Sequence, residues 1–109
     1  MAEEVESYSW IVLTSNNGVR IFFDALRKQG KDVRSLADLK FAVIGAATKE
    51  ELEKHGIFAD FVPSRYSSRE LAAEWIPTLR SDEKVLLARA EEASEELSDA
   101  LKEAGIDYE

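Results

Sequence analysis

The chain alternates between short, almost continuous apolar runs and longer stretches in which apolar residues recur every three or four positions. Four apolar runs have the pattern of strands buried in a sheet, namely Trp10–Thr14, Phe41–Ile44, Phe58–Val62 and Lys84–Ala88. The stretches between them have the spacing of amphipathic helices. This alternation predicts a parallel sheet with right-handed crossovers and helices on both of its faces.

Residues at the ends of the stretches predict where the helices begin and end. A cap by one of the asparagines Asn16 and Asn17 indicates the start of the first helix, and the capping boxes Thr48–Glu51 and Ser67–Glu70 indicate the starts of two others. Pro77 is expected to loosen the last turn of its helix. Three glycines stand where a left-handed residue after a helix is expected, at Gly30, Gly56 and Gly105.

Together these elements predict a single domain over residues 1–109, a three-layer α/β/α domain of flavodoxin-like type. With the four runs counted in chain order, we expect a parallel sheet of order 2-1-3-4, because Trp10–Thr14 is the most uniformly apolar run and belongs at the centre. Ile106–Glu109 is expected to add a rudimentary fifth strand beside Lys84–Ala88. So short a strand at the edge of the sheet favours the interpretation that the chain is a segment cut from a longer protein.

The composition restricts the chemistry. The 109 residues include no Cys and a single histidine, His55, which excludes disulfides, thiolate nucleophiles and multi-His or Cys metal sites. The 14 basic and 22 acidic residues give a net charge of −8, which repels nucleic acids and anionic membranes. We therefore expect a cytoplasmic protein that binds no metal, no nucleic acid and no membrane.

The loops that follow the apolar runs are the candidate ligand site. Ligands of open parallel sheets bind outside the carboxyl ends of the strands. These loops are rich in small polar residues and lead into helix N-termini, whose unpaired N–H groups suit a carboxylate or a phosphate. The alternative is that these residues only cap helices. Neither a dinucleotide fingerprint nor a Walker loop is present, so binding of those nucleotides is not supported.

An ordered set of segments resembles the middle domain of the uroporphyrinogen-III synthase family. The segments are Tyr8–Arg20, Phe41–Thr48, Gly56–Pro63 and Lys84–Arg89. They occur in the family's order, and the resemblance extends from Tyr8 to Tyr108.

The resemblance implies a cytoplasmic lyase of tetrapyrrole (haem and related porphyrin) biosynthesis that uses no metal or cofactor. Its substrate is the linear tetrapyrrole hydroxymethylbilane, which loses its hydroxyl group while ring D is inverted and the macrocycle closes. Two similar α/β domains face each other across a cleft, where N–H groups and hydroxyls hold the substrate's carboxylates. The resemblance places the following residues at the substrate: Thr14, Ser15, Asn16, Gly45, Thr48, Ser67, Ser68 and Arg89.

The chain also departs from the family pattern. A whole synthase is much longer, and Ala90 and Ser94 stand where relatives commonly have Gly and Arg. Two hypotheses remain. The chain is the substrate-binding half of a synthase, inactive without the missing second domain, or it is a non-catalytic, excised or engineered scaffold that folds independently. Whether it is an enzyme by itself stays open.

The edge of the predicted sheet generates a first prediction. Only Ile106–Glu109 covers Lys84–Ala88, so backbone groups of this strand remain for pairing with another chain. Repulsion between two acidic copies is screened beyond about 8 Å at physiological salt. We expect a concentration-dependent homodimer through this edge, measured by sedimentation equilibrium. A monomeric mass at every concentration would contradict it.

Overall fold

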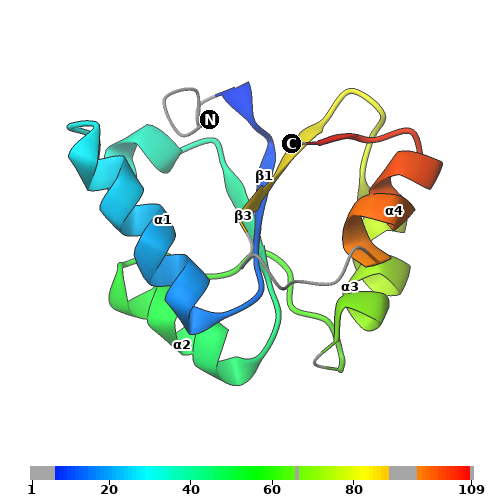
Figure 1. Ribbon diagram of the computed structural model, residues 1–109, viewed down its shortest axis with the longest axis horizontal. Helices are drawn as coiled ribbons and strands as arrows, with labels where there is room; N and C mark the ends of the chain where they lie inside the picture. The colour runs from blue at the N-terminus through cyan, green and yellow to red at the C-terminus, as the bar shows by residue number, and fades with distance from the viewer. Residues whose placement is uncertain (1–6, 66, 89–95, 109) are drawn as a thin grey trace.

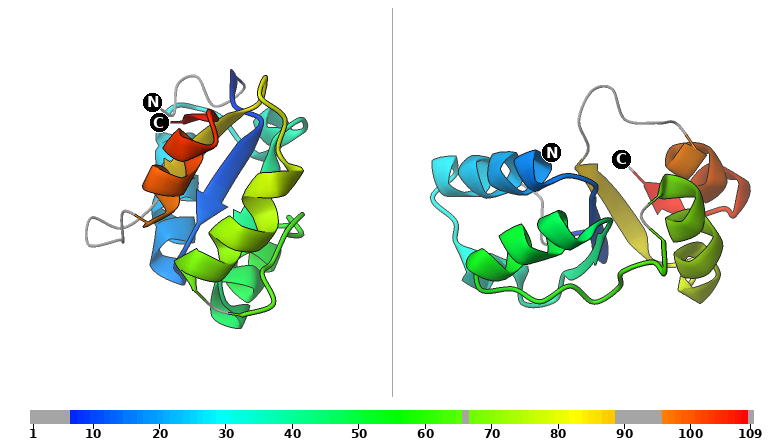
Figure 2. Two further views of the ribbon diagram at one scale, coloured as in Figure 1. Left: turned by 90° about the vertical axis from the view of Figure 1, so that its right-hand side faces the viewer. Right: turned by 90° about the horizontal axis from the view of Figure 1, so that it is seen from below.

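The computed structural model describes residues 7–65, 67–88 and 96–108, which form three layers. Helices α1 and α2 lie on one side of the strands, and α3 and α4 lie on the other (Figures 1 and 2). The elements are β1 Trp10–Leu13, α1 Asn16–Lys28, the 3-10 turn η2 Val33–Leu36, β2 Lys40–Val43, α2 Ala46–Lys54, α3 Ser68–Trp75, the 3-10 turn η3 Ile76–Thr78, β3 Lys84–Ala88, α4 Glu96–Glu103 and β4 Asp107–Tyr108.

The strands form one parallel sheet in the order β2-β1-β3-β4, which confirms the predicted fold class. Leu13, Val43 and Ala88 are register partners, so β1, β2 and β3 end at the same height. β4 pairs with β3 only at Asp107 and Tyr108, which confirms the expected rudimentary strand beside Lys84–Ala88. The carboxyl ends of three strands therefore lie side by side at one end of the sheet, which we call the carboxyl edge.

The segment Phe58–Val62 does not hold the third place in the sheet, where we expected it. Lys84–Ala88 takes that place, and Phe61 forms an isolated bridge to Ala42 on the outer side of β2. The reason is that this segment is not buried on both faces: the side chain of Phe58 is 78% exposed. The carboxylate of Asp60 accepts the N–H of Phe41 at 2.8 Å, at a position where a longer strand would use a carbonyl. The segment thus covers the edge of β2.

The side chains of β1 connect two hydrophobic cores, one on each face of the sheet. Ile11 and Leu13 pack in the core under α1 and α2, whereas Trp10 and Val12 pack in the core under α3 and α4. The helix residues that complete these cores are Val19, Phe22, Phe23, Leu26 and Leu52 on the first face and Leu71, Trp75, Leu97 and Leu101 on the second. Burial on both faces explains why Trp10–Leu13 is the most apolar run in the chain.

The two tryptophans form the centre of the second core. Their rings meet edge to face with centroids 5.4 Å apart, and the amine of Lys40 lies 5.6 Å from the Trp10 centroid. Both indole N–H groups are buried without a hydrogen-bond acceptor in the described part of the chain. Aromatic packing therefore has to outweigh the cost of two unpaired donors.

The helix ends confirm the predicted stops. Gly56 has φ +88°, which places it in the left-handed region, and the N–H of Ile57 then reaches back to the carbonyl of Leu52 at 3.4 Å. α4 ends with the same geometry at Gly105, where the N–H of Ile106 donates to the carbonyl of Leu101 at 3.0 Å. Pro77 lies in η3, the 3-10 turn that continues α3, so the last turn is indeed loosened.

Replacement of Leu52 tests the first core. Leu52 is fully buried, so Leu52→Ala leaves a cavity and should lower the free energy of unfolding by about 2–5 kcal/mol. Ile21→Ala on α1 is the control, because Ile21 is 60% exposed and should change stability by less than about 0.5 kcal/mol. Urea denaturation followed by circular dichroism measures both. Equal losses for the two variants would contradict this assignment of the core.

Candidate functional site at the carboxyl edge of the sheet

The candidate site lies where β1 and β2 end side by side. The N–H of Ile44 donates to the carbonyl of Leu13 at 3.2 Å, so the loops that follow these strands leave the sheet at neighbouring positions. The amino ends of α1, α2 and α3 all lie toward the lower side of Figure 1, at this edge of the sheet. The expected loops after β1, after β2 and before α3 are therefore found at one end of the molecule.

Ser15, rather than Asn16, caps α1. The Oγ of Ser15 accepts the N–H of Gly18 at 3.0 Å, and its carbonyl accepts the N–H of Val19 at 3.2 Å. Asn16 and Asn17 are the first two helical residues, so the expected cap by an Asn is wrong. Ser15 has the extended backbone of a cap residue, and its hydroxyl reaches the third residue beyond it. Thr14 is half-buried just before this cap.

The amino end of α2 lies at Gly45, not at Thr48 as the capping box predicted. Gly45 has φ +94°, a conformation that favours glycine, and its carbonyl accepts the N–H of Lys49 at 3.1 Å. Thr48 lies inside the first turn and is only 4% exposed. Because glycine has no side chain, no side-chain hydrogen bond caps this helix. The first N–H groups of α2 are therefore available to a ligand acceptor.

The amino end of α3 agrees with the sequence prediction. The Oγ of Ser67 accepts the N–H of Glu70 at 3.1 Å, which is the hydroxyl half of the predicted capping box. Ser68 is the first residue of the helix. Arg89, expected after the Lys84–Ala88 strand, lies outside the described residues.

Glu74 holds the loop before α3, a contact that the sequence analysis missed. Its carboxylate accepts the N–H of Ser64 at 2.9 Å and also the hydroxyl of Ser64. Both hydrogen bonds hold the pKa of Glu74 below its ordinary value, and the bond from the hydroxyl has the larger effect on the pKa. Ser64 and Glu74 are ten residues apart and belong to no local pattern, so only the fold brings them together.

A polar cluster fixes α1 against α2 and hence the relative placement of their amino ends. The carboxylate of Glu51, which is 12% exposed, lies 3.4 Å from the guanidinium of Arg20 and 3.6 Å from the imidazole of His55. The imidazole stacks on the ring of Phe23, with centroids 4.2 Å apart and planes 2° apart. His55 therefore has a structural role at the end of α2.

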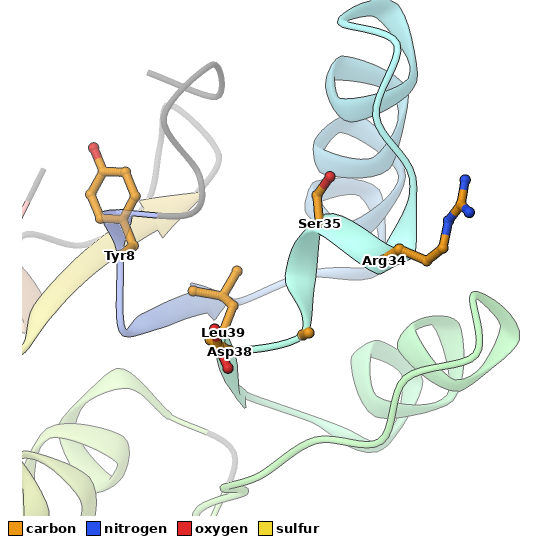
Figure 3. A pocket seen from close by; sticks show the side chains of 6 residues that line it. Tyr8, Arg34, Ser35, Asp38 and Leu39 are labelled. Carbon is orange, nitrogen blue, oxygen red and sulfur yellow. The ribbon is translucent and has the colours of Figure 1, made fainter.

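A hollow of about 260 Å³ lies at the opposite end of the sheet, beside the start of β1. It is lined by Tyr8 and by residues of η2 and the turn before β2, and the side chain of Arg34 extends away from Tyr8 (Figure 3). Arg34 already forms an ion pair with Asp32 at 2.9 Å. Ligands of parallel sheets bind at the carboxyl edge, so this hollow is not the candidate site.

The described ranges contain neither a metal-binding cluster nor a membrane-spanning helix. No group of three or more His, Asp or Glu side chains there is placed to hold a metal ion. None of the helices in those ranges is long and apolar enough to cross a membrane.

Comparison with known proteins identifies relatives of the whole chain. The family model of uroporphyrinogen-III synthase HemD matches residues 1–109. The porphyrin biosynthesis protein HemD of Ruminiclostridium josui is 36% identical over 107 residues, which cover 98% of this chain and 21% of that protein. Among solved structures, the wild-type uroporphyrinogen III synthase of Thermus thermophilus superposes with a TM-score of 0.78 at 22% identity, over 98% of this chain and 41% of that one. A mutant form of the same synthase gives a TM-score of 0.80 at 22% identity, over 98% of this chain and 42% of that one.

The caps at this edge can be tested by alanine substitution. Ser15→Ala removes the acceptor of the Gly18 N–H and should lower the free energy of unfolding by about 1 kcal/mol. Asn16→Ala, one position along, should cost less than half as much, since Asn16 provides no cap. Thermal and urea unfolding measure both values. A larger loss for Asn16→Ala would restore the Asn cap predicted from the sequence.

Proposed function

Because this chain belongs to the uroporphyrinogen-III synthase family, we propose that it forms one wall of the substrate cleft of such a synthase. Its ligand is the linear tetrapyrrole hydroxymethylbilane, held by acetate and propionate carboxylates. The observation that carries the proposal is the family match over the full length of the chain. The chain spans about a fifth of the curated relative and about two fifths of the solved synthases, so we further propose that it is inactive without a second domain.

The helix amino ends at the carboxyl edge supply groups suited to carboxylates. At Gly45 the first N–H groups of α2 have no side-chain acceptor, which leaves them for a ligand. At Ser15 and Ser67 the hydroxyl oxygen accepts a backbone N–H, but its own hydrogen can still be donated to a carboxylate. Capping and substrate binding are therefore compatible roles. In this proposal Thr14, Asn16, Thr48, Ser68 and Arg89 supply further donors to the substrate.

The net charge of −8 does not prevent an anionic ligand from binding. At physiological ionic strength, repulsion between solvent-exposed charges is screened beyond about 8 Å, whereas donors at contact distance act almost unscreened. Arg65 provides a local cation, since it is exposed in the loop before α3. We propose that Arg65 contacts one of the ligand's carboxylates.

We also propose that residues 1–109 form a single domain that acts in the cytoplasm without metal or cofactor.

Activity is tested with freshly prepared hydroxymethylbilane. The chain alone should leave the product as the type I isomer, which forms spontaneously, because one wall of a cleft does not orient ring D. Chromatographic separation of the oxidised isomers gives the ratio. Type III product in excess over an enzyme-free control would contradict the proposed inactivity and make the chain a synthase in its own right.

Binding is tested with a stable tetrapyrrole that carries the same acetate and propionate groups, uroporphyrin, by fluorescence titration. Arg65→Gln should weaken binding about three- to tenfold, as expected for the loss of one hydrogen bond of ordinary strength at an exposed site. Arg34→Gln makes the same change of charge at the opposite edge and should leave the affinity within about twofold. If the wild-type chain binds no porphyrin, the alternative of a non-catalytic scaffold replaces this proposal.

A further inference from the structure

We infer that Glu74 is a positioning residue of the candidate site, which holds Ser64 so that the neighbouring Arg65 is placed to contact a ligand carboxylate. This inference rests on the proposed function and deepens it. Glu74 lies in the last turn of α3, so its proposed effect on the ligand passes through the loop.

Both oxygens of the Glu74 carboxylate accept hydrogen bonds from Ser64. One oxygen accepts the backbone N–H of Ser64 at 2.9 Å, and the other accepts its hydroxyl. Two bonds from one planar group fix the orientation of Ser64 as well as its position. A hydrogen bond to an ionised acceptor is also stronger than one between neutral groups.

The other end of the loop is held by α3. The N–H of Ser67 donates to the carbonyl of Arg65 at 3.0 Å, and the hydroxyl oxygen of Ser67 accepts the N–H of Glu70. Arg65 thus lies between two anchored residues, Ser64 and Ser67. Because Ser64, next to Arg65, is already held by Glu74, the binding of a ligand to Arg65 has to order less of the chain and costs less conformational entropy.

The charges that face Glu74 are those of Arg65 and Glu70. Arg65 stabilises the carboxylate through its positive charge, although the two hydrogen bonds from Ser64 have the larger effect. The resulting pKa of Glu74 is below its ordinary value. Because the pKa of Glu74 is depressed, its hydrogen bonds with Ser64 are fully formed above the pKa of an ordinary glutamate. They are lost as the pH falls through the depressed pKa of Glu74.

The hydrogen bonds between Ser64 and Glu74 are tested by NMR. The amide proton of Ser64 should move upfield as Glu74 is protonated, with a midpoint below that of an ordinary glutamate, and this titration should disappear in Glu74→Gln. Glu50→Gln, an exposed position on α2, makes the same change of charge and should leave the titration intact. A Ser64 amide that does not titrate in the wild-type chain overturns the inference.

The effect on the ligand is tested by uroporphyrin binding. Glu74→Gln should weaken binding about three- to tenfold, although it removes a negative charge, whereas Glu50→Gln should leave it equal or slightly tighter. In an Arg65→Gln background Glu74→Gln should have little further effect, because both act through one contact. Equal affinities for the two Glu variants, or additive losses with Arg65→Gln, overturn the positioning role. If the wild-type chain does not bind porphyrin, both the proposed function and the positioning role of Glu74 are wrong. The titration of the Ser64 amide still reports the hydrogen bonds between Ser64 and Glu74 in that case.

Discussion

The burial of β1 on both faces is the constraint on which the rest of the structure depends. Ile11 and Leu13 are fully buried on one face, and Trp10 and Val12 are buried on the other. Because this strand lies between β2 and β3, its position fixes which strand ends share the carboxyl edge. The helices on either face then bring their amino ends to that edge, where the candidate site lies.

Sequence patterns predicted the features that depend on local chemistry. The apolar run Trp10–Leu13 could be identified as central because a strand covered on both faces has no polar side. The stops at Gly56 and Gly105 could be predicted because only a left-handed residue closes those helices. The cap at Ser67 followed from its spacing to Glu70. Each of these features involves residues a few positions apart.

The same patterns failed where distant parts of the chain decide the outcome. Phe58–Val62 is apolar enough for a strand, yet only its pairing with β2 determines that it covers an edge. The choice of Gly45 over Thr48 as the start of α2 depends on how β2 leaves the sheet. Nothing near Ser64 in the sequence indicates its contact with Glu74. Of the candidate site, the loops were therefore predictable, and the contacts that shape them were not.

The order of the strands also determines how the chain has to fold. Trp10 is the register partner of Lys40, thirty residues away, and of Val85, seventy-five residues away. The entropy lost on closing a loop grows with its length, so β1 pairs with β2 at a lower cost than with β3. The part of the chain up to α2 can thus form early around Ile11 and Leu13, with Trp10 and Val12 still exposed to water. In that order of folding, the face under α3 and α4 stays exposed to water longer than the other face and is the more open of the two to aggregation.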